Sequence, residues 1–142
     1  MRENRSMPRC AVIPELAYYD IEEAIGWLCN AFGFSLRLRI GAHRAQLNIG
    51  DGAVVLTKSQ PAKDSPTPEI PPTHAVMVRI EDVDSHCKQA ARAGAHILQS
   101  PADFPYGERQ YSAQDIAGHI WTFSQTLADV APEDWGGVTG RL

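Results

Sequence analysis

Histidine, cysteine and carboxylate side chains are the groups best able to bind a metal or move a proton, and this chain holds few of them in a catalytic spacing. The five histidines stand singly and form no H-x-E or H-E-x-x-H motif. Four of them are expected at turns or helix surfaces, in contact with solvent: His43, His86, His96 and His119. The sequence also lacks a G-x-S-x-G turn, a P-loop and a Gly-rich dinucleotide fingerprint. Local motifs therefore define no catalytic centre, and no catalytic residue is assigned.

The three cysteines do not supply one either. Cys10, Cys29 and Cys87 lie far apart and form no C-x-x-C pair, so neither a disulfide framework nor a zinc knuckle is indicated. We expect them to be reduced and buried as small apolar residues. Cys29 falls in an apolar helical segment, which disfavours a reactive thiolate. Any chemistry must come from side chains that the fold brings together.

Two segments have the pattern of an amphipathic helix with defined ends. Asp20 is followed three residues later by Glu23, a capping box for the first turn, and Gly33 is placed to end the helix. Apolar residues recur between these ends at three- and four-residue spacing. A second helix with a narrower stripe is predicted from Asp82 to Gly94. Its ends follow those of the first by 62 and 61 residues, which indicates an internal repeat.

Predicted strands surround each helix in the same order. They cover residues 10–19, 35–40, 44–49 and 53–58 in the first half, and 74–80, 95–100, 109–114 and 119–125 in the second. Glycine and aspartate residues at 50–52 and 115–118 provide turns for the closing hairpins. Each half therefore has the order strand, helix and three strands, written βαβββ.

These patterns divide the chain into five parts: an N-terminal arm (1–9), a first βαβββ module (10–59), a linker (60–73), a second module (74–126) and a tail (127–142). The linker contains five of the ten prolines, which remove backbone donors and favour extended conformations. The modules form one domain of the α+β class. The pattern leaves open whether they pair within one chain or between two chains.

The duplicated βαβββ order and two local stretches resemble the vicinal oxygen chelate superfamily, in its glyoxalase and bleomycin resistance protein-like branch. The stretches are AIGWLCNAFGF at 24–34 and PYGERQYSAQDIAGHIWTFSQ at 105–125. The resemblance covers about residues 10–126. It implies that each module curls a mixed sheet into a half-open barrel, and that paired modules enclose a cleft for a ligand and often a divalent metal. It also implies a homodimer.

Metal-dependent members of this superfamily carry His, Gln or Glu near the middle of the first and last strand of each module, where such ligands suit divalent metals. The corresponding positions here hold Ile13, Val55, Ala75 and Thr122. His74 is one residue from the third position, but a shift of one residue turns a strand side chain to the opposite face. We therefore expect no metal ion and no other cofactor.

Strand alternation predicts which side chains line the cleft. The inward row would contain the polar residues Glu15, Thr57, Arg79, Thr122 and Ser124. The outward, helix-facing row would be more uniformly apolar, and contains Val12, Leu16, Val54, Leu56, Val76, Val78, Trp121 and Phe123. An apolar cleft with a few polar groups is typical of sites for small organic molecules. Glu15 and Arg79 hold matching places in the two modules, so an ion pair between them is an alternative to ligand binding.

A second candidate cluster precedes the last hairpin and consists of Phe104, Tyr106, Arg109 and Tyr111. Aromatic rings provide flat contact area, and arginine stacks on them or binds an anion. This cluster would form a ligand-stacking rim. Alternatively, the loop packs against the sheet and Arg109 pairs with Glu108 or Asp115.

Two further aromatic residues are expected to make packing contacts. Trp27, on the first helix, would pack or contact a second subunit. Trp135, in the tail, would anchor that tail, and a partner subunit is one surface for it.

Composition limits the partners. The chain has 13 basic and 17 acidic residues, a formal charge of -4, and no run of five or six like charges, so nucleic acid is not an expected partner. No apolar segment resembles a signal-peptide core or approaches the roughly 18 residues that span a bilayer. We expect a soluble, cytoplasmic protein with no membrane partner.

These observations favour a protein that binds a small organic molecule in a metal-free cleft, for example to sequester a drug. The candidate ligand-binding residues are Glu15, Thr57, Arg79, Tyr106, Arg109, Tyr111 and Thr122. The alternative is a metal-dependent lyase, isomerase or dioxygenase of the vicinal oxygen chelate type, or a metal-free enzyme in which Glu15, its pKa raised by apolar surroundings, acts as general base. A third possibility is an interaction module whose cleft is filled by side chains.

Overall fold

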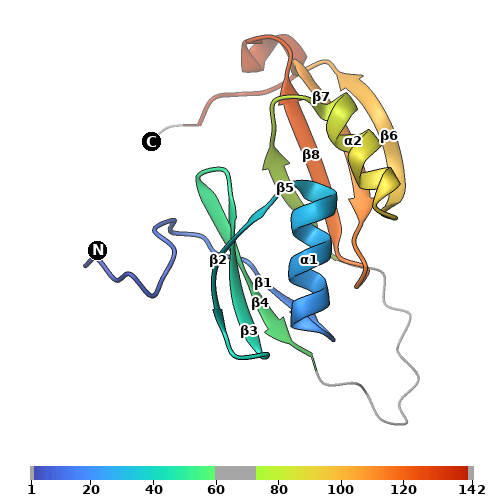
Figure 1. The fold of residues 1–142 in the computed structure, drawn as a ribbon. Helices are drawn as coiled ribbons and strands as arrows, with labels where there is room; N and C mark the ends of the chain where they lie inside the picture. Colours follow the sequence, from blue (N-terminus) through green and yellow to red (C-terminus); the bar gives the residue numbers. More distant parts are fainter. Residues whose placement is uncertain (1, 60–72, 141–142) are drawn as a thin grey trace.

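Two βαβββ modules follow one another along the chain in the computed structural model, which describes residues 2–59 and 73–140 (Figure 1). The first contains β1 (Glu15–Tyr18), α1 (Ile21–Phe32), β2 (Ser35–Ile40), β3 (Arg44–Ile49) and β4 (Gly52–Lys58). The second contains β5 (Val76–Arg79), α2 (Val83–Arg92), β6 (His96–Phe104), β7 (Glu108–Gln114) and β8 (Ile120–Thr126), followed by a 3-10 helix, η1 (Pro132–Trp135). The predicted α+β class and element order are confirmed. All but one residue of the predicted linker, residues 60–72, lies outside the described residues.

The helix ends are those that the sequence specifies. The Asp20 side chain accepts a hydrogen bond from the Glu23 N–H at 3.0 Å, and Gly33 ends α1 with a left-handed φ of 78°. Asp82 accepts from the Ser85 N–H at 3.1 Å in the same way. The α2 helix ends at Arg92 with Ala93 as its C-cap, and Gly94, whose φ is 94°, follows.

Each module forms a four-stranded mixed sheet, in the order β1-β4-β3-β2 and β5-β8-β7-β6. The first and last strands of a module pair in parallel and the others are antiparallel. Strand β1 is shorter than predicted, because pairing with β4 begins only at Glu15, directly after Pro14. Val12 precedes the strand and is 80% exposed, so the prediction that it faces a helix is wrong.

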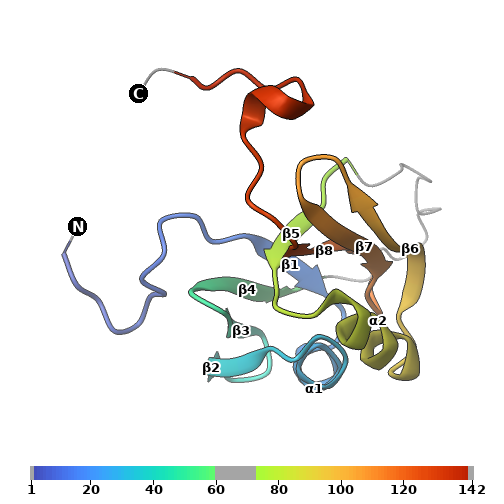
Figure 2. The same cartoon turned by 90° about the horizontal axis from the view of Figure 1, so that it is seen from above.

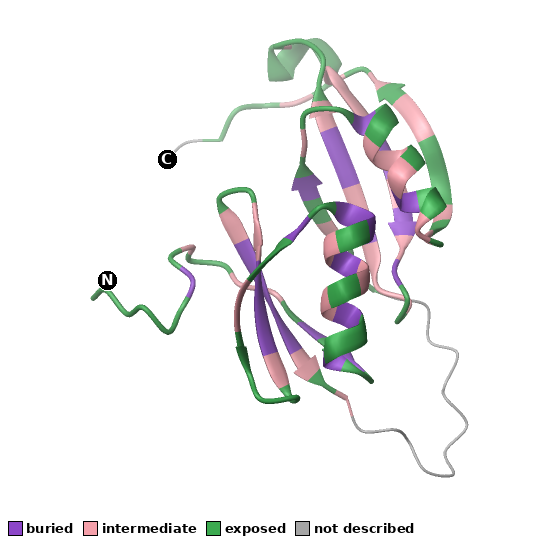
Figure 3. Ribbon diagram, in the orientation of Figure 1, coloured by how far each residue is buried: buried purple, intermediate pink, exposed green. Residues whose placement is uncertain are grey.

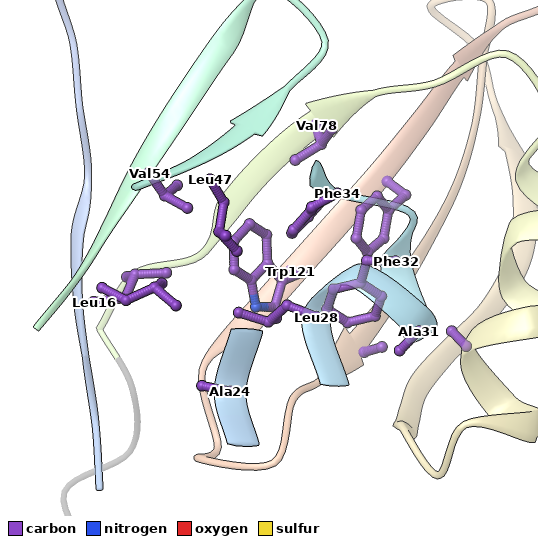
Figure 4. Close-up of a cluster of buried hydrophobic side chains, with 14 of the residues drawn as sticks. Leu16, Ala24, Leu28, Ala31, Phe32, Phe34, Leu47, Val54, Val78 and Trp121 are labelled. Carbon is purple, nitrogen blue, oxygen red and sulfur yellow. The ribbon is translucent and has the colours of Figure 1, made fainter. Parts of the chain in front are cut away.

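A single core lies between the helices and the sheets (Figure 3). It draws on both modules: Phe32 and Phe34 of the first lie 5.7 and 5.2 Å from the Trp121 ring of the second, centroid to centroid (Figure 4). The predicted helix-facing row is confirmed at six positions, each at most 9% exposed: Leu16, Val54, Leu56, Val78, Trp121 and Phe123. None of the described helices is long and apolar enough to cross a membrane.

The modules are joined through their helices and strand ends. Trp27 Nε1 of α1 donates to the carbonyl of Ala93 at 2.9 Å, and Gln89 Nε2 of α2 donates to the carbonyl of Asn30 at 3.2 Å. Trp27 therefore packs within its own chain. Figure 2 shows α1 and α2 next to each other on one side of the sheets, with both terminal segments on the other. The two sheets do not close into one barrel within the chain.

A buried carboxylate completes this junction. Asp115 Oδ2 accepts from Tyr18 Oη at 2.5 Å and from Trp121 Nε1 at 3.0 Å. Its Oδ1 accepts from the backbone N–H groups of Ala117 and His119. Burial, and then the negative charge of Asp115, raise the pKa of Tyr18 far above its usual value, so this hydroxyl remains a donor. The network fixes β1 of the first module against the β7–β8 turn of the second.

Candidate functional site

Four polar side chains form a row of two hydrogen-bonded pairs on the face of the second sheet that carries no helix. Gln110 pairs with Ser124 across β7 and β8, and Ser112 pairs with Thr122, so these four side chains share one face. Gln110 Nε2 donates to Ser124 Oγ at 3.0 Å, and the Ser112 and Thr122 hydroxyls lie 2.9 Å apart. Ser124 in turn donates to Glu108 Oε1 at 2.7 Å. The sequence analysis predicted Thr122 and Ser124 on this face but did not name Gln110 and Ser112. Alternation of side chains along β7 assigns both of them to the same face.

Arg79 lies at the edge of this row, on β5. Its guanidinium donates to Thr126 Oγ1 at 2.8 Å and its side chain is exposed. A hollow of about 350 Å³ opens beside it at the junction of the modules, lined in part by Val12, Ile49 and Met77. The alternative Glu15–Arg79 ion pair is absent among the described residues, because Glu15 pairs with Arg44 of β3, in its own sheet, at 2.9 Å.

The corresponding face of the first sheet carries Glu15 and Thr57, but its middle is covered. Val55 and Gln46 are 3% and 4% exposed although no helix lies on this side. The cover is the N-terminal arm, since Gln46 Nε2 donates to the carbonyl of Ser6 at 3.0 Å. The predicted arm is therefore part of this face.

The predicted aromatic rim is divided between the two faces of β7. Tyr106 lies on the helix-free side, where its hydroxyl donates to Gln110 Oε1 at 3.3 Å. Arg109 instead bonds to Asp84 of α2 and Asp103 of β6, at 2.9 and 2.7 Å. Tyr111 is fully buried beneath α2. Alternation of side chains along the strand excludes a common surface, so the placement of Arg109 and Tyr111 in the cleft is wrong.

His86 corrects a second expectation, because it is half-buried in the core rather than solvated. Its ring lies 4.2 Å from that of Phe123, and Nε2 is 2.9 Å from the carbonyl of Phe32. That carbonyl only accepts, so Nε2 carries a proton and Nδ1 accepts from the Tyr111 hydroxyl. Burial lowers the pKa of His86 and raises that of Tyr111. The pair connects the end of α1 to the second module.

The tail contacts its own chain through Trp135. The Trp135 ring lies 4.9 Å from that of Tyr106, which stacks on Phe104 at 5.5 Å. Gly107 allows the close approach, because a Cβ there would stand 2.4 Å from the carbonyl oxygen of Ala128. The aromatic residues thus form a cluster at one end of the helix-free face.

The donor set does not fit a divalent metal. Ile13, Val55, Ala75 and Thr122 offer one hydroxyl between them at the positions where the resembling proteins hold ligands. His74 is exposed and precedes β5. Across residues 2–59 and 73–140, no three His, Cys, Asp or Glu side chains converge as a metal site would require. The three cysteines are free and only partly buried.

Duplicated βαβββ modules with mixed sheets and one helix each define the glyoxalase-like class of α+β proteins. The family model of the Glyoxalase/Bleomycin resistance protein/Dioxygenase superfamily matches residues 10–123. The chain belongs to this superfamily, as the sequence resemblance indicated.

Three known proteins are similar to this chain, two in sequence and one in fold alone. TioX from Micromonospora sp. ML1 has a crystal structure that is 34% identical, with a TM-score of 0.67 over 86% of this chain and 100% of that one. An uncharacterized protein of Mycolicibacterium smegmatis is 33% identical over 112 residues, which cover 79% of this chain and 90% of the relative. The fosfomycin resistance protein FosX from Mesorhizobium loti shares the fold, at 15% identity and a TM-score of 0.62 over 84% and 93% of the two chains.

Proposed function

We propose that this protein binds a small organic molecule without a metal ion, on the helix-free faces of its two sheets. The observation that carries the proposal is the row of two hydrogen-bonded pairs, Gln110–Ser124 and Ser112–Thr122, beside the exposed Arg79. Gln110 and Ser124 are buried, so the accessible hydroxyls of the row are those of Ser112 and Thr122. A few positioned polar groups next to apolar surface are what a small-molecule site uses to orient its ligand. The same residues provide no donor set for a divalent metal. Stoichiometric binding, such as the sequestration of a drug, is the function that they support best.

A homodimer completes the site in this proposal. The modules of one chain are fixed through their helix sides, so neither helix-free face closes on the other. Val12 and Met77 remain 80% and 62% exposed at the module junction, and exposed apolar residues around a hollow are typical of an interaction surface. The first sheet of one copy, with its N-terminal arm, would then lie opposite the second sheet of its partner, and both chains would line the cleft.

The enzyme alternatives have less support. A metal-dependent lyase, isomerase or dioxygenase needs ligands that the four strand positions lack. General-base catalysis by Glu15 assumed apolar surroundings, whereas its side chain is 60% exposed and paired with Arg44. Binding therefore remains the proposal to test first.

A thermal-shift screen of a broad compound library, followed by calorimetric titration, tests ligand binding. Replacing Thr122 by Val removes one hydroxyl of the row while keeping the side-chain shape, and is expected to weaken a confirmed compound at least fivefold. Ser100→Ala is the matched control, because it removes an exposed hydroxyl from the outer strand β6. Failure of every compound, or equal affinity for both variants, would count against the proposal.

Two physical measurements test the remaining parts. Light scattering on the protein eluting from a size-exclusion column is expected to give twice the 15.6 kDa chain mass. A monomeric mass would refute a cleft lined by two chains. Elemental analysis after purification in the presence of Zn, Ni, Mn and Fe is expected to show no stoichiometric metal. A bound metal that is lost in His74→Ala would overturn the metal-free assignment.

A further inference from the structure

The N-terminal arm reaches the first sheet as a folded turn. The Met7 N–H donates to the carbonyl of Asn4 at 3.1 Å, and the Ser6 N–H donates to Asn4 Oδ1 at 3.0 Å. This turn presents the carbonyl oxygens of Arg5, Ser6 and Met7 toward the sheet. Three successive backbone acceptors therefore meet one surface.

Two side chains of the sheet donate hydrogen bonds to all three carbonyl oxygens. Arg37 Nη2 donates to the carbonyls of Arg5 and Met7 at 3.0 and 2.9 Å, and Gln46 Nε2 donates to that of Ser6 at 3.0 Å. Arg37 Nη1 also donates to Gln46 Oε1 at 2.5 Å. Because the two side chains are bonded to each other, their donors are held in a fixed arrangement before any acceptor arrives.

A β-bulge aims Arg37 at this face. Leu36 and Leu38 pair with the adjacent residues Leu47 and Gln46, so Arg37 is an additional residue in β2. The bulge places Arg37 and Leu38 together on the side of Gln46, while Arg39 returns to the helix side and approaches Glu22 of α1 at 3.8 Å. The donor pair thus depends on a specific irregularity of the sheet.

Recognition of the arm uses its main chain and the ring of Pro8. The residues from 2 to 9 are exposed except Pro8, which is buried directly after the bonded carbonyls. The sheet residues beneath are almost fully covered, with Ala53, Val55 and Gln46 at 7%, 3% and 4% exposed. Such a site selects for the arrangement of carbonyl oxygens and for an adjacent buried ring, not for the exposed side chains of the arm.

We propose that Arg37 and Gln46 form a binding site for a folded peptide, or a peptide-like compound with successive carbonyl groups, and that the arm is its resident occupant. The ligand enters by exchange with the arm. This inference rests on the proposal that the helix-free faces bind ligands, and it names the chemical class for the first sheet. The arm is part of the same chain, so it competes with a free ligand for the site at an effective concentration of about 1 mM. A ligand must bind tightly enough to displace it.

The test uses the full chain with its arm released. Pro8→Asp places a charge where a proline is buried, so the arm is expected to leave the face. The probe is a fluorescein-labelled peptide with the wild-type sequence of residues 2–10, followed by fluorescence anisotropy. We expect Pro8→Asp to bind this peptide at least tenfold more tightly than the wild-type chain. The same peptide with Asn4 and Pro8 replaced by alanine lacks the turn contact and the buried ring, and should bind at least tenfold more weakly. Equal affinity for the two chains, or no binding by either, would overturn the proposal.

A second substitution, added to the Pro8→Asp chain, tests whether Arg37 binds the peptide. Arg37→Met should weaken peptide binding at least tenfold, because it removes two of the three bonds to the carbonyls. Arg39→Met is the matched control on the same strand and opposite face, and should change binding less than twofold. If both variants behave alike, Arg37 is not the recognition residue.

A separate measurement does not depend on Pro8→Asp. Trypsin cleaves after arginine, and Arg5 and Arg9 lie in the docked arm. Arg37→Met in the otherwise wild-type chain should accelerate cleavage at these residues at least fivefold, and Arg39→Met should not; equal rates would refute docking by Arg37. The compound screen separates the two proposals: compounds that bind while the peptide fails overturn only this inference, and peptide binding without any compound overturns only the broader function.

Discussion

Removing the Tyr18 hydroxyl is the most direct test of how the two modules are held together. Tyr18→Phe keeps the buried ring and deletes one hydrogen bond to Asp115, which still accepts from Trp121 and two backbone N–H groups. The donor and the space around it are both buried, so no water replaces the lost contact without rearrangement.

The expected loss follows from the type of bond. A hydrogen bond to a charged acceptor contributes about 1.5 to 3 kcal/mol, and three donors remain on the carboxylate, so a loss of about 2 kcal/mol is expected. For a chain of this length, a shift of about 3 °C per kcal/mol lowers the thermal midpoint by about 6 °C.

Urea unfolding at fixed protein concentration, followed by tryptophan fluorescence, measures this loss. Fixed concentration matters because association of chains adds to apparent stability. Tyr19→Phe provides the control, since Tyr19 is the next residue and 67% exposed. If Tyr18→Phe unfolds at the same urea concentration as Tyr19→Phe, the Tyr18–Asp115 bond does not join the modules as described.

Three other substitutions make independent predictions. Asp115→Asn places an amide N–H group against two donors, and should cost at least about 3 kcal/mol in urea unfolding; a loss below about 1 kcal/mol would contradict the described network. Burial lowers the pKa of His86, so the stability it contributes is present above the unfolded value of about 6.5 and is lost as the pH falls through the folded pKa. Thermal unfolding midpoints measured from about pH 7.5 to 5 should fall less in His86→Gln than in the wild type. Parallel curves of midpoint against pH for the two proteins would exclude a buried neutral imidazole. Gly26 lies within α1, where an added Cβ meets nothing within 4 Å, so Gly26→Ala should raise the thermal midpoint by about 3 °C; a lower midpoint would show a contact that the structure lacks.

Local signals in the sequence predicted most of the architecture. The caps Asp20 and Asp82 bond as expected, and the ranges of β2 and β3 are exact. These features succeed because capping and alternation are decided within a few residues. Alternation along the strands likewise predicts the row of buried, helix-facing residues.

Features that depend on distant partners were missed, although two of them had a local signal. His86 is three residues after Val83 and four before Ala90, which places it on the buried stripe of α2. Counting along β7 also separates Gln110 from Arg109 and Tyr111. The docking of the arm had no such signal, because it depends on the bulge at Arg37, and the strand sequence does not specify a bulge.

The paired bonds between the helix ends retain a trace of symmetry. Trp27 and Gln89 are 62 residues apart, the spacing of the repeat, and each donates to a carbonyl near the end of the opposite helix. Such a reciprocal contact is self-complementary, as interfaces between identical subunits are. The two modules therefore meet through their helices as two identical subunits would. The Tyr18–Asp115 bond has no counterpart, since Ile80 stands at the corresponding place, so this bond locks the two modules in an arrangement that the symmetric helix contacts alone leave equivalent.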